Sequence, residues 1–336
     1  MENVVVPTRY TYCDNVSSVS YATRLLARSS YLIIDCEGKN LGGTDGVLSL
    51  MCIGTERAEH VFLFDVLALK AQPRNAHMPR RLEHILSNPA VRKVMWDCRN
   101  DFLEVLGQYG VALQGILDLQ LAEIHSRISV RGEKEWKRMA RLAAGGKRLP
   151  LPLIKQNPDL FLGVHGLQGM DACIKEARLV VTGKDPQVVA MHKANGSTIW
   201  LERPLLPQLL QYAAHDIEMI GALYEYFKQN LWIRPSNEDT LVDQSMRYAY
   251  SLYYQGRVAD DHIFGSSSVL PLDILREPHG LTVPCHGCRR MLSLNCYTIY
   301  RQGRKIHSRT NLCRICQIKL LIKQVNYPVA WVNVSF

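Results

Sequence analysis

The stretch YLIIDCEG, residues 31–38, opens with an apolar run typical of a buried β-strand and closes with two acids. Side chains alternate along a strand, so Asp35 and Glu37 project from the same face. Carboxylates at the end of a strand whose other face is core are costly unless they bind something. We therefore predict that this pair ligates metal. The D-x-E spacing alone carries little weight, because it also occurs at Asp216 and Glu218.

Around this stretch, strand and helix patterns alternate in the order expected of a mixed α/β sheet. A glycine-rich turn at 38–46 leads into two more short apolar runs, which predicts a meander of three strands. Helical spacing follows, interrupted by one further buried strand. The predicted strands are 31–36, 47–54, 60–66 and 91–96. The predicted helices are 15–28, 78–88, 101–110, 116–128 and 204–229.

Three more side chains are candidates for the same site. Asp101 opens a predicted helix soon after the strand 91–96, although the helix dipole by itself also favours an acid at a helix start. Asp97 competes with it as the functional acid of this segment. Tyr212 and Asp216 lie four residues apart on a predicted helix, so one helix face carries a phenol and a carboxylate together. An aromatic residue packed beside a surface acid would give the same pattern.

These residues belong to three composite motifs that carry a family resemblance. The motifs are YLIIDCEG, then WDCRNDFLEVL, then W-x-x-RPL followed by YAAHD, and they occur in this order between about residues 15 and 230. In that order they resemble the RNase D-type 3′–5′ exonucleases of the DEDD superfamily, and more narrowly its Egalitarian-like branch of 3′–5′ exonuclease domain-containing proteins. The resemblance implies an α/β fold of the RNase H-like kind, a mixed sheet flanked by helices.

The resemblance also implies a catalytic set. Carried over by position, it consists of Asp35, Glu37, Asp101, Tyr212 and Asp216. The leading acid of DFLEVL ranks Asp101 above Asp97, and the tyrosine implies the DEDDy subclass. The four carboxylates would hold two Mg²⁺ or Mn²⁺ ions, as in other two-metal sites. Tyr212 would orient the water that attacks the terminal phosphodiester.

Two functions are compatible with these motifs. The first is a metal-dependent exonuclease that hydrolyses single-stranded RNA or DNA from the 3′ end. The alternative is a non-catalytic nucleic-acid-binding adaptor on the same fold. An adaptor has no reason to keep the four carboxylates and the tyrosine, and all five are present here. The motifs therefore favour the enzyme, and they do not distinguish RNA from DNA.

Arg203 lies in the block that contains the third motif. It is predicted to contact nucleic-acid phosphate. Support of the helix that carries Tyr212 is an equally good interpretation. The thiols of Cys36 and Cys98 flank the acids without an evident basic neighbour or partner histidine, which favours packed core cysteines over reactive ones.

Two CxxC pairs lie near the C-terminus, Cys285 with Cys288 and Cys313 with Cys316, with 24 residues between them. This spacing is typical of two knuckles that close a Cys₄ site. We predict that the four thiolates hold one structural Zn²⁺ in a small zinc-ribbon-like module. The alternative is a mixed site that recruits His286, Cys296 or His307.

The net charge of +9 is concentrated in the same region, because residues 281–336 contain nine Lys and Arg and no Asp or Glu. A basic module suggests a polyanionic partner, and Arg289, Arg290 and Arg301 are predicted to contact nucleic acid. Docking of this module onto another protein is the alternative. A second basic stretch, 127–148, ends near two glycines and is predicted to be an exposed, mobile insertion.

The predicted organisation is an exonuclease domain at 1–234, a connector at 235–278 and a zinc-binding basic module at 279–336. No apolar run approaches the roughly 20 residues that a membrane helix needs. The N-terminus has neither the basic flank nor the apolar core of a secretory signal. We therefore expect an intracellular protein, in the nucleus or the cytoplasm, with no membrane partner.

Overall fold

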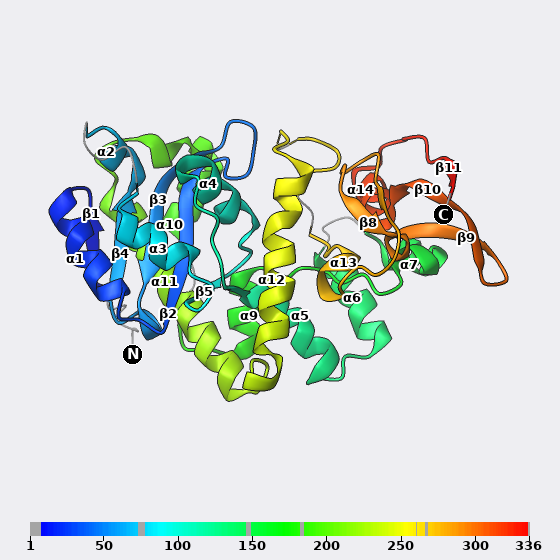
Figure 1. Ribbon diagram of the computed structural model, residues 1–336, viewed down its shortest axis with the longest axis horizontal. Helices are drawn as coiled ribbons and strands as arrows, with labels where there is room; N and C mark the ends of the chain where they lie inside the picture. The colour runs from blue at the N-terminus through cyan, green and yellow to red at the C-terminus, as the bar shows by residue number, and fades with distance from the viewer. Residues whose placement is uncertain are drawn as a thin grey trace. The chain divides into compact units, whose positions relative to one another are not determined.

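Figure 1 shows the computed structural model, which describes residues 8–72, 78–145, 149–181, 185–259, 261–265 and 268–334. The chain divides into two compact units. The first comprises Met1–Glu123 and Gly169–Tyr250, and the second comprises Ile124–Gln168 and Ser251–Phe336. These boundaries fall inside two helices, α5 (Leu119–Ser129) and α12 (Pro235–Gln255). They differ from the predicted domain limits.

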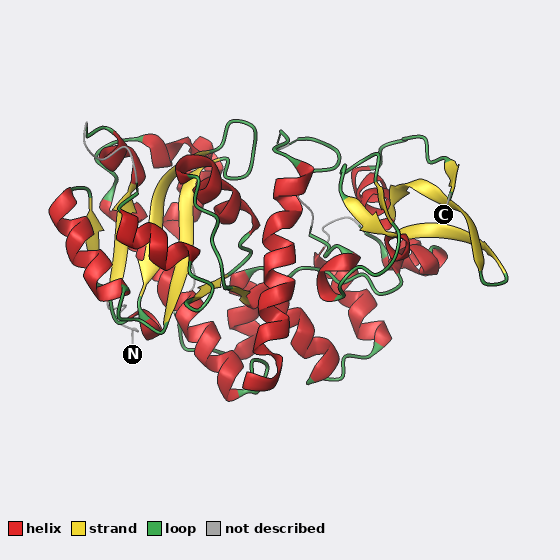
Figure 2. Cartoon of the chain, viewed as in Figure 1, coloured by secondary structure: helices red, strands yellow, loops and turns green. Residues whose placement is uncertain are grey.

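The first unit is built on a six-stranded mixed sheet with the strand order β1-β4-β3-β2-β5-β6 (Figure 2). Strand β3 runs antiparallel to both of its neighbours, and the remaining neighbours pair in parallel. The strands are β1 (Tyr10–Cys13), β2 (Tyr31–Lys39), β3 (Val47–Gly54), β4 (Val61–Asp65), β5 (Arg92–Met95) and β6 (Ile116–Asp118). The predicted mixed sheet is confirmed.

Helices flank this sheet, as predicted. Besides α5 and α12, those of the first unit are α1 (Val16–Leu26), α2 (Val66–Lys70), α3 (Arg80–Ser87), α4 (Arg99–Tyr109), α9 (Met170–Ala177), α10 (Pro186–Asn195) and α11 (Pro207–Gln229), with the 3₁₀ turns η1 (Glu56–Ala58) and η2 (Gly196–Leu201). Within the described ranges, none of the helices combines the length and the apolar character needed to cross a bilayer.

The long helix α11 covers the sheet face on which the first acidic pair lies. Ile33 of β2 is buried in one core with the α11 residues whose spacing predicted a core-facing stripe: Leu209, Ala213, Ile217, Ile220, Tyr224 and Phe227. Asp35 and Glu37 follow Ile33 at steps of two residues, so they project toward the same side. The helix begins at Pro207 rather than at the predicted Pro204.

The predicted helix 116–128 is wrong for its first three residues. Ile116–Asp118 form β6, which pairs in parallel with β5. Helix α5 starts only after Asp118, whose carboxylate accepts the backbone N–H of Gln120 at 2.8 Å. This is the interaction of a helix cap, and it marks where the strand ends. The edge strand β1 is missing from the prediction, since four residues are too few to show a period.

The second unit has small α and β elements around one apolar core, which contains all four CxxC cysteines and Cys296. A three-stranded antiparallel sheet has the order β11-β10-β9, and β7 pairs with β8. The elements are α6 (Glu135–Gly145), α7 (Leu151–Gln156), α8 (Pro158–Phe161), α13 (Leu272–Leu275), β7 (Thr282–Pro284), β8 (Met291–Ser293), η3 (Leu294–Cys296), β9 (Tyr297–Gln302), β10 (Lys305–Cys313), α14 (Arg314–Lys323) and β11 (Trp331–Asn333).

The predicted connector 235–278 is not a linker over its first half. Residues 235–255 form the continuous helix α12. Its side chains hold the first unit together: the Ser245 hydroxyl accepts the backbone N–H of Asp118 at 2.9 Å, and the Tyr248 hydroxyl donates to Gln120 at 2.9 Å. The polar residues that suggested a connector therefore serve as buried hydrogen-bonding groups.

The basic stretch 127–148 is largely exposed over its described residues, as predicted, but it contains a helix and two buried cations. Residues 135–145 form α6, and both Arg127 and Arg138 are buried. Nη1 of Arg127 donates to the Gly166 carbonyl at 2.9 Å, and Nη1 of Arg138 donates to a carbonyl of α8 at 3.0 Å. These cations satisfy main-chain oxygens, which explains how a charge-rich segment packs. Residues 146–148 lie outside the described ranges.

Arg203 ties the segment before α11 to the sheet. Its Nε and Nη2 donate to the two carboxylate oxygens of Asp65 at 2.7 and 2.8 Å. Asp65 is fully buried and also accepts from the Tyr12 hydroxyl and from the backbone N–H of Ala68. Nη2 of Arg203 donates further to the Ser49 hydroxyl at 2.8 Å. This placement favours the structural interpretation of Arg203 over the phosphate contact.

We expect Arg203→Met to lower the free energy of unfolding of the first unit by about 3–5 kcal/mol, because it leaves a buried carboxylate without its partner. Adding Asp65→Asn should recover part of the loss. Urea unfolding followed by circular dichroism measures both variants. A single variant as stable as the parent, yet weaker in binding an oligonucleotide, would support the phosphate contact instead.

Candidate active site and cysteine cluster

Three predicted metal ligands meet at the sheet face under α11. Asp35 and Glu37 come from β2 and Asp216 from the middle of α11, and one carboxylate oxygen of each lies within 4.8 Å of the others. Asp35 pairs across the ladder with Cys52 of β3. The strand therefore fixes the first two acids, and the packing of α11 on the sheet brings the third to them.

Asp101, in the first turn of α4, is the fourth acid of this group. Burial and the neighbouring charge of Asp35 hold the pKa of Asp101 well above its usual range, and its carboxylate accepts the backbone N–H of Cys36. The buried thiol of Cys52 has a raised pKa, due to burial and then to the charges of Asp35, Glu37, Asp216 and Asp101. The charges of all four acids therefore act on the thiol of Cys52.

The acids open into a cleft of about 470 Å³. Its walls include Asp35, Glu37, Tyr212 and Asp216 together with Trp96, Asp97, Gln120, Met170 and Asp171. Tyr212 lies one turn before Asp216 on α11, and its ring packs beside Trp200 and His192 with centroids 6.3 Å from each. The phenol and the carboxylates therefore share one solvent-accessible space.

Asp97 and His215, which are close in sequence to the predicted acids, each bind another side chain. Asp97 forms a two-point ion pair with Arg99, at 2.6 and 2.8 Å, although it also lines the cleft. Its backbone has a φ of 55°, a conformation that few residues other than glycine adopt. Nδ1 of His215 lies 3.1 Å from Glu218. This geometry favours Asp101 over Asp97, and it gives His215 a structural partner.

The chemistry of this donor set suits divalent cations that prefer oxygen. The three carboxylates that line the cleft and the buried Asp101 beside them repel each other when ionised, and a bound cation would relieve that repulsion. Mg²⁺ and Mn²⁺ take such hard oxygen ligands, whereas thiols and imidazoles favour softer metals. The cleft wall residues Gln120, Met170 and Asp171 were missed in the sequence, because no local period or motif sets them apart, and Trp96 opens the second motif but was not assigned to the site.

The second centre is the group of four cysteines at the core of the second unit. The sulfur atoms of Cys285, Cys288, Cys313 and Cys316 all lie within 4.8 Å of one another. The Sγ atoms of Cys285 and Cys316 are 3.7 Å apart, and those of Cys288 and Cys313 are 4.0 Å apart. A tetrahedron with Zn–S distances of about 2.3 Å has edges of about 3.8 Å. The cluster therefore fits one tetrahedral metal.

Groups around the sulfurs complete this fit. The backbone N–H of Cys313 donates to Sγ of Cys285 at 3.2 Å, and Nε of Arg290 donates to Sγ of Cys288 at 3.3 Å. Such donors stabilise thiolates. A Cβ added at Gly287 would lie 2.9 Å from Sγ of Cys316, so this knuckle needs glycine. The mixed-site residues His286, Cys296 and His307 are outside the cluster.

The basic side chains of residues 281–336 fall into two classes. Five bind groups of the second unit: Arg290 binds a thiol, and Arg309, Arg314, Lys319 and Lys323 bind main-chain carbonyls. The other four, which are Arg289, Arg301, Arg304 and Lys305, are exposed. Of the predicted nucleic-acid contacts in this region, Arg289 and Arg301 therefore face solvent, whereas Arg290 is buried beside Cys288.

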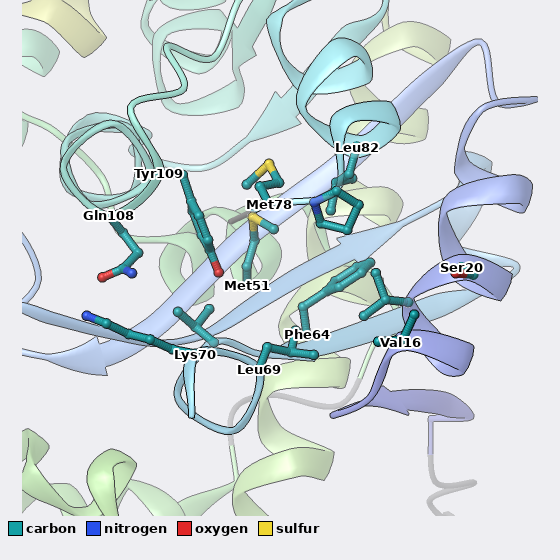
Figure 3. Close-up of a pocket in the computed structure, with 13 residues that line it drawn as sticks. Val16, Ser20, Met51, Phe64, Leu69, Lys70, Met78, Leu82, Gln108 and Tyr109 are labelled. Carbon is teal, nitrogen blue, oxygen red and sulfur yellow. The ribbon is translucent and has the colours of Figure 1, made fainter. Parts of the chain in front are cut away.

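A separate cavity of about 330 Å³ lies on the opposite side of the sheet from the acids. Its walls are mainly apolar, with Met51, Phe64 and Leu82 in the interior, and Figure 3 shows the hydroxyl of Tyr109 pointing into it. The lining includes no carboxylate, so this cavity does not share the chemistry of the acidic cleft.

Comparison with known proteins agrees with this geometry. Residues 10–142 match the sequence profile of the 3′–5′ exonuclease family. RNase D of Trypanosoma brucei is similar at 23% identity over 84% of this chain and 85% of that one, with a TM-score of 0.57. Its GMP complex is 20% identical over 88% and 82%, with a TM-score of 0.58. Its complex with the RNA U12 is 21% identical over 84% and 83%, with a TM-score of 0.54.

A search of curated proteins finds no match to this chain. The fold that these solved structures share with the chain is the one the motifs predicted. Residues 10–142 match the model of the 3′–5′ exonuclease family, and the chain has the fold of RNase D.

Proposed function

We propose that this chain is a metal-dependent 3′–5′ exonuclease of the DEDDy type, which hydrolyses single-stranded RNA or DNA from the 3′ end. The observation that carries the proposal is the convergence of Asp35, Glu37, Asp216 and Tyr212 on one cleft, with Asp101 buried close to Asp35. The complex of the T. brucei enzyme with the RNA U12 supports nucleic acid as the ligand. No feature of the described residues favours the adaptor alternative.

In this proposal, Asp35, Glu37 and Asp216 would hold one cation, and Asp101 would contribute to holding a second. Bound divalent cations would lower the pKa of the attacking water and neutralise charge on the scissile phosphate. Tyr212 would orient that water through its hydroxyl, since its ring is wedged beside Trp200 and its helix also carries Asp216.

The cleft also offers surfaces for the end of the substrate. The Trp96 and Met170 side chains line it beside the acids. An indole next to the acids can stack on the terminal base without reading its identity. Such contacts fit an enzyme that shortens an end rather than one that recognises a sequence.

The direct test is incubation of the purified chain with 5′-labelled RNA and DNA oligomers, in Mg²⁺, in Mn²⁺ and in EDTA. Stepwise shortening from the 3′ end that requires the metal supports the proposed function. Tight binding without shortening in any metal would contradict it and would support the adaptor.

Asp35→Asn should lower the single-turnover rate by about a thousandfold or more. The substitution removes one of the proposed metal-ligating carboxylates, and several kcal/mol of metal-dependent stabilisation correspond to about this factor. Asp45→Asn is the control, since Asp45 pairs with Lys39 in the turn after β2 and should keep nearly full activity. Equal rates for the Asp35 variant and the parent would refute the assignment.

Tyr212→Phe should lower the rate about 10- to 100-fold, because the variant keeps the ring but loses the hydroxyl that orients water. Cation binding should change little, as followed by titration calorimetry with Mn²⁺. A variant that turns over normally would remove Tyr212 from the catalytic set. A variant that loses Mn²⁺ binding to the same extent as activity would show that the hydroxyl acts through the metal site.

We further propose that the four cysteines bind one structural Zn²⁺ and that Arg289 and Arg301 contact nucleic acid. The near-tetrahedral spacing of the sulfurs supports the metal. The exposure of both arginines on a module without acids supports the contacts.

Mass spectrometry under native conditions should find one zinc ion per chain in the parent. Cys288→Ser should abolish the bound zinc and lower the melting temperature of the second unit, since metal binding contributes directly to folding in small modules. Cys296→Ser is the matched control: this cysteine is equally buried in the same core but outside the cluster. Loss of zinc from both variants would contradict the assigned ligand set.

A further inference from the structure

One face of the sheet β11-β10-β9 carries two exposed aromatic rings. Tyr300 of β9 is 56% exposed and Trp331 of β11 is 57% exposed. Large aromatic side chains are normally buried, and their exposure on a small sheet calls for an explanation. The sequence places Tyr300 among basic residues as a possible stacking residue, whereas Trp331 does not stand out, because β11 is only three residues long.

The register of the sheet places both rings on the same face. Ser308 of β10 pairs with Tyr300, and Thr310, two residues further along β10, pairs with Trp331. Residues that pair directly project from the same face, and so do residues two apart on one strand. The rings therefore flank the central strand. They lie diagonally across the face, with Ser308 and the buried Thr310 of the central strand between them.

The opposite face of this sheet belongs to the interior of the module. Tyr297 is buried there, with its hydroxyl donating to the Val283 carbonyl at 2.8 Å, and the guanidinium of Arg309 stacks on its ring 4.5 Å from the centroid. Tyr297 is therefore committed to the core. The Tyr300 and Trp331 face is the one that remains open to a ligand.

The strands hold the two rings in place. The backbone N–H of Asn311 donates to the Ala330 carbonyl at 2.8 Å, and that of Val334 donates to the His307 carbonyl at 3.0 Å. These bonds extend the pairing of β11 beyond both of its ends. Hydrogen bonds therefore hold the strand of Trp331 at both of its ends. This limits the conformational entropy lost when a ligand packs on the Trp331 ring.

The charge around this face is positive. Arg301, Arg304 and Lys305 are exposed at the tip of the β9–β10 hairpin, next to Tyr300. No acidic residue occurs between positions 281 and 336. Two rings for stacking beside a row of cations form the combination that single-stranded nucleic acids bind, because every base has a stackable face and every nucleotide a phosphate.

We propose that the Tyr300 and Trp331 face is a stacking platform for single-stranded nucleic acid, a binding site separate from the acidic cleft. It rests on the proposed function only in taking nucleic acid as the partner. Two unpaired bases stack on the two rings, and the hairpin cations contact the adjoining phosphates. A duplex cannot use the platform, since its bases are stacked on each other.

The test uses the full-length chain with Asp35→Asn, so that the probe stays intact. Fluorescence anisotropy measures binding of a labelled 12-nucleotide uridylate oligomer and of a 12-base-pair RNA duplex. Tyr300→Ala and Trp331→Ala should each weaken binding of the oligomer about tenfold, as expected for loss of one stacked base. Tyr300→Phe and Trp331→Phe should restore it, which guards against simple misfolding.

Two controls separate stacking from charge. Trp136→Ala removes another exposed tryptophan, 70% exposed on α6 of the same unit, and should leave affinity unchanged. Arg301→Gln should reduce the salt dependence of binding by about one counterion, whereas the aromatic variants should leave that slope unaltered.

Unchanged affinity in both alanine variants would overturn the platform, as would an equal loss of duplex binding. Degradation assays with the unmodified chain keep this outcome apart from the proposed function. Metal-dependent shortening with no role for the two rings would leave the exonuclease standing without the platform. Ring-dependent binding with no shortening in any metal would leave the platform standing without the exonuclease.

Discussion

Repulsion among four buried or half-buried carboxylates is the constraint on which the first unit depends. Asp35 and Glu37 are fixed by one strand, Asp101 by the helix after β5, and Asp216 by α11. Burial and the neighbouring charge of Asp35 raise the pKa of Asp101, so ionised acids in this place destabilise the fold. The six-stranded sheet and the core beneath α11 supply the opposing free energy. The acids come from three different parts of that frame, so the cleft exists only when all three are folded.

The fold was predictable where the hydrophobic period was long. The strands around YLIIDCEG and the stripe on α11 show such periods, and both were located correctly. The three-residue strand β6 was predicted as helix, because it merges without a break into the apolar pattern of α5. The acids were identified through the motifs rather than through the D-x-E pair. Met170 and Asp171 reach the same cleft from a segment with no signal of its own, since tertiary packing alone brings them there.

Charge was the least reliable guide to local structure. The basic stretch 127–148 suggested a solvated insertion, yet Arg127 and Arg138 are buried and donate to main-chain carbonyls. A guanidinium offers five donors in a fixed fork, so it can close several orphan carbonyls at once. Arg314 and Lys319 do the same in the C-terminal module. A run of cations in sequence therefore predicts a polyanion partner only for those side chains that the fold leaves exposed.

Two arginines of the first unit also bind groups of the protein itself. Arg99 makes a two-point pair with Asp97, and Arg203 makes one with Asp65. Both pairs neutralise acids outside the proposed metal-ligand set, although both arginines belong to the motifs that contain that set. An arginine placed instead beside Asp35 would lower the pKa of that carboxylate but would also compete with a divalent cation for its oxygens. Because these two guanidinium groups bind Asp97 and Asp65, they stabilise the first unit without competing with a cation for the proposed metal ligands.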